Sequence, residues 1–525
     1  MHKPAIVTAL LLAASLAAPA RAQKVEEASI ADLQAMMAKG TSSEAITRAY
    51  LARIAAMDRK GPALRAIIAT NPDAIAQARA ADARRRAGKP LGPLDGVPVL
   101  VKDNIETADP MPTTAGSLAL KDNLTRRDAP VVARLRAAGA VILGKANLSE
   151  WANIRSSRSN SGWSAVGGQV RNPYALDRTP CGSSSGSGAA VAASFAAVAL
   201  GTETDGSVVC PSSINGLVGL KPTIGMVSRT HVVPISHSQD TPGPMARSVR
   251  DAATLFSAMV GSDPADAATQ GADARARDYA AALAPGALKG MRIGVLRPQM
   301  TEAQARVYDA ALAVLKSRGA ELVDVEAPAA PGLGEAEFQV LITELKADMA
   351  SYLATAPAAV KARSLDDLIA FNRANAAAEM PYFGQETFEA AAKTKGLDDW
   401  EYRGARAKSQ RLAGAEGIDA MLAKARVSLI VAPTTGPAWL IEPVYGDQGQ
   451  GPSASRLPAV SGYPHLTVPM GLVRGLPVGL SFIGPAFSEA LLLSAGYDYE
   501  QAARARVAPR YLPSADIGPG QDGAR

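Results

Sequence analysis

One stretch, residues 180–221, constrains the fold of this chain more than any other. It holds two turns rich in glycine and serine, separated by a run of small apolar residues, Ala189 to Leu200. Glycine permits positive φ and close backbone approach, and a serine hydroxyl can act as a nucleophile or carry a proton. An isolated Gly/Ser run is usually a flexible linker, but the apolar run indicates a packed element. The two turns therefore predict a site around a buried helix.

Three known motifs compete for the first turn. A phosphate-binding loop requires a lysine after its last glycine, and a dinucleotide fingerprint requires a third glycine in place of Val191, so both fail. The nucleophile elbow G-x-S-x-G is matched by Gly182, Ser184 and Gly186. That motif requires a preceding strand and a later histidine base, whereas residues 172–181 hold two prolines and no apolar alternation. A histidine-dependent serine esterase or hydrolase with Ser184 as nucleophile is therefore kept as the alternative.

The same stretch resembles the signature of the amidase signature family of serine hydrolases. That signature joins a GSS turn to a G-S nucleophile turn and then to a GLKPT segment. This sequence has, in these places, Gly182-Ser183-Ser184, Gly206-Ser207 and Gly219-Leu220-Lys221-Pro222-Thr223. The similarity begins at about Ser29 and covers most of the chain. Three residues depart from the common pattern and, with residues 230–240, resemble bacterial peptide amidases: Cys181, Ser185 and Asp205.

The resemblance implies a catalytic triad with an acyl-enzyme intermediate. Ser207 is the expected nucleophile, Ser183 a bridging hydroxyl after a cis peptide bond, and Lys102 the base. Lys102 matches the family pattern G-V-P-x-x-x-K-D and ends the apolar run Val97 to Val101, which reads as a strand buried on both faces. Burial would lower the lysine pKa from about 10.4 and so allow the neutral, basic form near neutral pH.

The second turn supplies the expected oxyanion hole. Its donors would be the backbone N–H groups of Thr204, Asp205, Gly206 and Ser207, and losing one such donor costs about 10²- to 10³-fold in rate. The Asp205 side chain should point away from the oxyanion, toward the substrate nitrogen. Two further residues are candidate supporting residues, Ser184 and Thr202.

The two cysteines, Cys181 and Cys210, flank the serine turns. If Ser183 and Ser207 touch, the cysteines are neighbours. A disulfide, worth roughly 3 to 4 kcal/mol in the chain-entropy model, and two buried free thiols are equal alternatives. No C-x-x-C pair or zinc-ligand spacing occurs, so we expect no metal and no cofactor.

The ends of the chain differ in composition from its body. Residues 1–22 combine Lys3, an apolar run and an A-x-A site, which predicts a secretory signal peptide and a periplasmic or secreted protein. The run is too short for a membrane anchor. Without residues 1–22 the formal charge falls by two, to +4, which is too weak to suggest nucleic acid. We expect a catalytic domain over residues 23–508 and a flexible tail over 509–525.

The remaining pattern predicts an α/β fold, because strand-like and helical stretches alternate. We expect a single large domain with a central mixed, twisted β-sheet covered by helices on both faces. Helix starts are expected at Thr41-Ser42-Ser43-Glu44, Asn71-Pro72, Asp128 and Ser248. Further strands are expected at Ala140–Leu143, from Lys221 to about Ile235, and at 291–296, 320–325, 427–432, 466–470 and 478–483. Residues 334–426 are mainly helical, and a last helix covers 488–506.

These observations predict an enzyme that hydrolyses a carboxamide C–N bond to an acid and ammonia or an amine. The resemblance to peptide amidases suggests the C-terminal amide of peptides as substrate. The family also contains the glutamine-amide-handling component of tRNA-dependent amidotransferases, which is the other alternative. Small-molecule or peptide amides are the expected binding partners, and the expected assembly is a monomer or small homo-oligomer.

Overall fold

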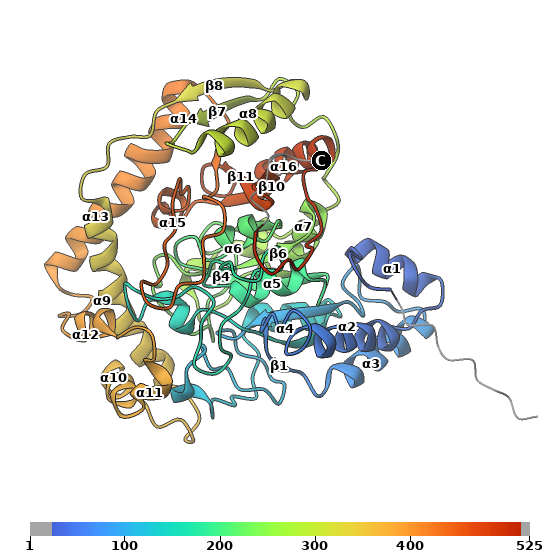
Figure 1. Cartoon of the computed structure of the whole chain (residues 1–525), viewed down its shortest axis with the longest axis vertical. Helices are drawn as coiled ribbons and strands as arrows, with labels where there is room; N and C mark the ends of the chain where they lie inside the picture. Colours follow the sequence, from blue (N-terminus) through green and yellow to red (C-terminus); the bar gives the residue numbers. More distant parts are fainter. Residues whose placement is uncertain (1–23, 516–525) are drawn as a thin grey trace, which may run out of the picture.

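The computed structural model describes residues 24–515, and the predicted signal peptide therefore lies outside the described residues. Eleven strands form one mixed sheet in the order β1-β3-β2-β4-β6-β5-β10-β11-β9-β7-β8. Helices pack on both faces of this sheet (Figure 1), as the sequence predicted. The strands are β1 (Ile67–Thr70), β2 (Pro98–Lys102), β3 (Val141–Ala146), β4 (Val198–Glu203), β5 (Val218–Lys221), β6 (Thr241–Ala246), β7 (Arg292–Leu296), β8 (Glu321–Val325), β9 (Leu429–Pro433), β10 (His465–Val473) and β11 (Leu476–Ile483).

Helices lie before, between and after these strands along the chain. They are α1 (Ile30–Ala38), α2 (Ser43–Met57), α3 (Ala74–Arg86), α4 (Pro130–Ala137), α5 (Ser185–Ala192), α6 (Val209–Ile214), α7 (Val249–Met259), α8 (Glu302–Ser317), α9 (Leu333–Ala354), α10 (Leu365–Ala374), α11 (Ala376–Glu379), α12 (Glu386–Ala392), α13 (Trp400–Ala413), α14 (Asp419–Ala425), α15 (Arg456–Ser461) and α16 (Glu489–Ala503). Helices α9 and α13 pack together along one side of the molecule (Figure 1), in the region expected to be mainly helical.

Strand β2 lies between β3 and β4 and is parallel to both. Every one of its residues is buried, which explains why it reads as a continuous apolar run. Val101 pairs with Leu200 of β4, so the carboxyl ends of β2 and β4 meet at one edge of the sheet. This register brings the side chain of Lys102 beside the last residues of β4.

Helix α5 confirms the packed element predicted between the two serine turns, but it is shorter than the apolar run. All its residues are buried, and the chain becomes strand β4 from Val198 onward. Gly186 in its first turn lies so close to the backbone that a Cβ there would approach the carbonyl oxygens of Ala66 and Asn147 to 2.3 and 2.4 Å. Small residues are therefore required for this helix to lie against its neighbours.

The prediction of strands from Lys221 to about Ile235 is wrong. Residues 222–240 form a loop, and the strand of this region is β6, which lies between β4 and β5. Its sequence, TPGPMA, contains two prolines, which argue against an interior strand. Pro242 and Pro244 lie opposite Thr202 and Leu200 of β4, while the ladder to β5 involves only Met245 and Ala246. On the β5 side no ladder hydrogen bond is therefore lost at the prolines.

Three expected helix starts need correction, and one is confirmed. Ser42, not Thr41, caps α2, because its side chain accepts from the Ala45 backbone N–H. Asp73 precedes α3 in place of Asn71, and Ala129 precedes α4 in place of Asp128. Asp128 instead binds Arg136 on the same helix. Ser248 caps α7 as predicted, by accepting from the Asp251 N–H.

The first residues of the expected flexible tail form backbone hydrogen bonds with residues 173–176. The backbone N–H of Tyr511 donates to Pro173 O at 2.9 Å, and Leu176 N–H donates to Leu512 O at 2.8 Å. Residues 516–525 lie outside the described residues. Between residues 24 and 515, no helix is both long and apolar enough to span a bilayer.

Candidate active site

Lys102 lies at the buried end of β2 with an exposed fraction of zero. Its Nζ donates to Ser183 Oγ at 2.7 Å, to Thr202 Oγ1 at 2.8 Å and to Thr202 O at 3.2 Å. Asn104 also donates to Thr202 Oγ1, at 2.9 Å. The charged Nζ can donate to all three oxygens; in the neutral amine Thr202 can hold both remaining hydrogens, and the lone pair then faces Ser183 Oγ.

Burial lowers the pKa of Lys102 to about 7, against the opposing charges of Asp240 and Glu203. The contrast with Lys145, which is equally buried, is informative. Both lysines donate to hydroxyl and carbonyl oxygens. Lys145 also lies 3.8 Å from a carboxylate oxygen of Asp103, whereas Lys102 forms no such ion pair within residues 24–515. Lys102 therefore gains less stabilisation of its charged form, as a general base requires.

The peptide bond between Gly182 and Ser183 is cis, as the resemblance implied. A Cβ at Gly182 would lie 2.1 Å from Ser149 Oγ, so only glycine fits at this position. The carbonyl oxygen of Ser183 accepts from the Ser149 backbone N–H at 3.0 Å. These contacts direct the Ser183 hydroxyl toward Lys102.

The second turn is joined to the first through the backbone, because Ser184 N–H donates to Ser207 O at 3.1 Å. Gly206 has a φ of +81°, a conformation that favours glycine. Ser207 has an exposed fraction of 8%, while Ser183 and Lys102 have none. Of these three side chains, Ser207 is therefore the one that a substrate can reach.

The backbone N–H groups of the second turn are available to a ligand. Within residues 24–515, no hydrogen bond of the protein uses the N–H of Thr204, Asp205, Gly206 or Ser207 as donor. The next two N–H groups of the chain, at 208 and 209, donate to a side-chain oxygen of Glu203 at 2.8 and 3.0 Å. The turn thus presents free donors beside Ser207, the arrangement that binds an oxyanion.

Ser184 has a structural environment. Its Oγ donates to Thr202 O at 3.0 Å and accepts from Thr202 N–H at 3.1 Å, and the side chain is fully buried. Neither His231, His237 nor His465 interacts with it among the contacts of residues 24–515. The geometry therefore does not support Ser184 as a histidine-activated nucleophile.

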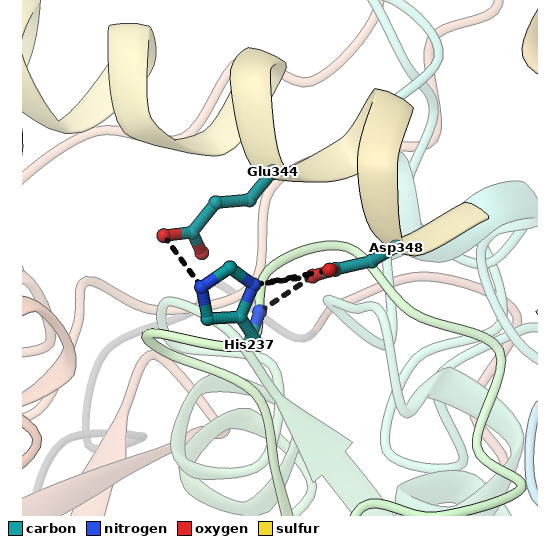
Figure 2. A group of neighbouring side chains, drawn as sticks. All are labelled: His237, Glu344 and Asp348. Atoms are coloured by element: carbon teal, nitrogen blue, oxygen red, sulfur yellow. Dashed lines mark hydrogen bonds and ion pairs between the residues drawn. The ribbon is translucent and has the colours of Figure 1, made fainter. Parts of the chain in front are cut away.

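His237 is bound between two carboxylates on α9 (Figure 2). Its Nδ1 lies 3.0 Å from both carboxylate oxygens of Asp348, and its Nε2 lies 3.4 Å from Glu344 Oε1. The hydrogen bond to Asp348 raises the pKa of His237, against the effect of partial burial. The nitrogen and oxygen atoms of His237, Glu344 and Asp348 that could bind a metal ion lie within 4.8 Å of one another. Since Glu344 also accepts from Ser238 and Tyr402, its oxygens already have protein donors.

The other two histidines lie in different surroundings. His465 is fully buried on β10 with Nε2 2.6 Å from Ser481 Oγ, and burial lowers its pKa to about 3. His231 is partly exposed, with Nδ1 4.0 Å from a Glu106 carboxylate oxygen.

The two cysteines form a disulfide, which decides between the alternatives left by the sequence. Cys181 and Cys210 are 29 residues apart in sequence and 6.1 Å apart between Cα atoms. The disulfide links Cys181, two residues before Ser183, to Cys210, three residues after Ser207. The amide of Asn215 adds a second tie, because Nδ2 donates to Pro180 O at 2.9 Å.

Sequence reasoning missed several residues of this site. Asn104 directly follows the K-D of the family pattern, so its place in the motif was the available signal. Gln239 and Asp240 lie in the segment 230–240, which resembles peptide amidases, but no role was predicted for them. Their side chains bind Thr204 O at 3.2 Å and Thr204 Oγ1 at 2.6 Å, respectively. Glu337 comes from α9, and no local motif marks it.

A family model described as Amidase matches residues 45–493. The chain belongs to the amidase family. This amidase is 52% identical to the native peptide amidase of Stenotrophomonas maltophilia, whose structure superposes with a TM-score of 0.89 over 93% of this chain and 99% of that one. It is 39% identical to a probable amidase of Arabidopsis thaliana, over 93% of this chain and 92% of the relative.

The amidase is also 38% identical to a component of the glutamyl-tRNA(Gln) amidotransferase of Roseiflexus castenholzii, over 90% of this chain and 95% of the relative. The predicted family and fold are thus confirmed, and the protein is a hydrolase of amide C–N bonds.

Proposed function

We propose that this amidase removes the C-terminal amide of peptides and releases ammonia. The observation that carries the proposal is the 2.7 Å hydrogen bond between buried Lys102 and Ser183, in a turn joined to that of Ser207. Similarity to a solved peptide amidase supports the substrate class.

In the proposed mechanism Ser207 is the nucleophile. As Ser207 Oγ attacks the carboxamide carbon, its proton passes to Ser183 Oγ while the Ser183 proton passes to the neutral Nζ of Lys102. The free N–H groups of the second turn stabilise the oxyanion. When the C–N bond breaks, the relay runs in reverse and protonates the departing nitrogen. Water then attacks the acyl-Ser207 ester, assisted by the same relay, and releases the acid.

Asp205 is the proposed acceptor for the substrate nitrogen. Its Oδ1 is buried and has no hydrogen-bond partner among the described residues. A carboxamide N–H donated to Oδ1 would turn the carbonyl oxygen toward the backbone donors of the same turn. Asp205→Asn should therefore weaken amide turnover, and unchanged turnover and substrate preference would contradict this role.

The test is ammonia release from a panel of peptide C-terminal amides and simple carboxamides. We expect release by the parent protein and near-complete loss in Lys102→Ala, Ser183→Ala and Ser207→Ala, because each removes one step of the proton relay. Lys121→Ala, at an exposed position, is the matched control. Full activity in Lys102→Ala would refute the lysine relay, and release from simple carboxamides alone would refute the peptide substrate.

The amidotransferase similarity gives a second candidate function, the hydrolysis of glutamine as one component of a multi-protein complex. Glutamine turnover that appears only with co-purified partner proteins would favour it.

We further propose a periplasmic or extracellular location. The composition of residues 1–22 and the disulfide support it, since disulfides persist in oxidising compartments. Cell fractionation with N-terminal sequencing tests it. A mature protein that begins at residue 23 outside the cytoplasm is expected, and an uncleaved cytoplasmic protein would contradict it.

A further inference from the structure

Two carboxylates of α9 hold the segment Ser236 to Ser238. Glu344 and Asp348 approach the ring of His237 from opposite sides (Figure 2). Its Nδ1 lies 3.0 Å from both carboxylate oxygens of Asp348, and its Nε2 lies 3.4 Å from Glu344 Oε1. The backbone N–H of His237 also donates to Asp348 Oδ2, at 2.8 Å. Because the two acids are one helical turn apart, they present both carboxylates on the same face of α9.

Both ring nitrogens of His237 need a hydrogen in this geometry. An ionised carboxylate only accepts hydrogen bonds, and a neutral imidazole carries a single N–H. The imidazolium has two N–H groups and can donate to both acids. Glu344 accepts from four further donors, which favour its ionised form: the hydroxyls of Ser236, Ser238 and Tyr402 and the backbone N–H of Ser238. The contacts therefore fit a positively charged His237.

Other charged groups near His237 are balanced or screened. Arg406 Nε, from α13, lies 4.0 Å from one of the two carboxylates, but its side chain is 43% exposed, so solvent screens its charge. The guanidinium of Arg229 donates to the carbonyl oxygen of His237 and is paired with Asp266. The hydrogen bond to Asp348 raises the pKa of His237, against the effects of burial and Arg406. The side chain is 37% exposed, so it can exchange protons with solvent.

The same loop is hydrogen-bonded to the second serine turn. Gln239 Nε2 donates to Thr204 O at 3.2 Å, and Thr204 Oγ1 donates to Asp240 Oδ1 at 2.6 Å. The other oxygen of Asp240 accepts from two backbone N–H groups of the loop, at 2.8 and 2.9 Å. Thr204 lies three residues before Ser207, and its backbone N–H belongs to the proposed oxyanion hole. A displacement of the loop at His237 therefore moves a donor of that hole.

We propose that His237 is a positioning residue for amide hydrolysis, whose imidazolium binds the loop of residues 222–240 to α9 and so keeps Thr204 aligned with Ser207. This inference rests on the proposed function, in which Ser207 is the nucleophile. When the imidazolium loses a proton, one ring nitrogen presents a lone pair to a carboxylate oxygen, and the two repel. The loop then loosens from the helix, and the transition state loses part of its stabilisation. Amide hydrolysis is thus coupled to the charge of His237.

The ratio of kcat/KM between the parent and His237→Gln, measured from about pH 6 to about pH 10, tests the proposal. Glutamine can still donate hydrogen bonds but carries no charge. Lys102 and Asp240 are present in both proteins, so their titrations cancel in the ratio. Loss of an oxyanion donor costs about 10²- to 10³-fold, and a misaligned donor costs less, so we expect the parent to be roughly fivefold faster at about pH 6. The difference should appear in kcat rather than in KM.

The sign of the pH dependence follows from the charge. The parent has its advantage where His237 is protonated and loses it as the pH rises through the raised pKa of His237, so the ratio should fall toward one. His231→Asn is the matched control in the same loop, because φ at this position is +62°, which asparagine accepts. This control should behave as the parent at every pH.

Two results would overturn the proposal: a ratio that stays constant across the pH range, or a control variant that behaves as His237→Gln does. If the parent hydrolyses only simple carboxamides, the peptide part of the proposed function fails. The ratio is then measured with a simple carboxamide and tests His237 all the same.

NMR titration of the imidazole C–H groups gives a measurement without turnover. Burial lowers the pKa of His465 to about 3 and that of His231 below its usual value, so a titration above about pH 6.5 belongs to His237. In Asp348→Asn this titration should move to lower pH, whereas Glu335→Gln, at an exposed position of the same helix, should leave it in place. A titration of His237 at or below about pH 6.5 in the parent would also overturn the proposal.

Discussion

Removal of the disulfide by the double substitution Cys181→Ala and Cys210→Ala should lower the stability of the protein and leave its chemistry largely intact. The bond closes a loop with a sequence separation of 29. The chain-entropy model assigns roughly 3.5 kcal/mol to a loop of this size, through the conformational freedom that the unfolded chain regains. Contacts that join the two turns without the cysteines remain, including the bond from Ser184 N–H to Ser207 O.

The expected change in melting temperature follows from the size of the domain. An unfolding entropy of about 2.1 cal/mol/K per residue gives about 1 kcal/mol/K for a domain of this length. A loss of roughly 3.5 kcal/mol then corresponds to a melting temperature lower by about 3 to 4 °C. Ammonia release at 25 °C should stay within about twofold of the parent, because the folded geometry of the serine turns is retained.

The assay combines thermal unfolding, peptide mapping and activity. The non-reduced parent should yield a linked peptide that contains both cysteines and disappears on reduction. Reductant should lower the melting temperature of the parent and leave that of the double variant unchanged. Two separate alkylatable cysteines in the parent would refute the pairing. A loss of activity beyond tenfold without a change in melting temperature would refute the reasoning that other contacts keep the turns together.

Three further outcomes are expected. The rate of ammonia release should rise with pH through about 7, since the pKa of Lys102 is lowered to that value and only the neutral amine above it accepts a proton; a flat profile of kcat/KM from pH 6 to 8 would contradict this. Ser184→Ala should cost about 1 to 3 kcal/mol in stability, because it leaves the buried Thr202 N–H without its acceptor, while ammonia release should fall less than tenfold; a folded but inactive variant would revive Ser184 as nucleophile. Gly186→Ala should fold poorly, because its Cβ would lie 2.3 Å from a carbonyl oxygen. The control Gly404→Ala, whose Cβ would have no atom within 4 Å, should fold as the parent does. Soluble yield and thermal unfolding measure the difference, and equal stability of the two variants would refute the close packing of α5.

Local sequence determined much of the architecture. Val97 to Val101 reads as a buried strand because every position of β2 is buried, and Ser248 caps α7 through a contact only three residues long. The serine turns and the G-V-P-x-x-x-K-D pattern identified the residues of the candidate site, since each lies in a short, distinctive motif. Predictions from the sequence failed where contacts between distant segments overrode a local pattern. Strand β6 was not predicted; its two prolines lie opposite residues of β4, and only Met245 and Ala246 pair with β5.

The sequence by itself determined the family, the fold class and the residue types of the site, because these depend on hydrophobic pattern and on contiguous motifs. The tertiary structure alone decided which groups surround those residues. The pairing of Cys181 with Cys210 and the hydrogen bond from Gln239 to Glu337 join segments 29 and 98 positions apart. Burial and neighbouring charge set the pKa of a group, and both are properties of the packed molecule that no local pattern encodes.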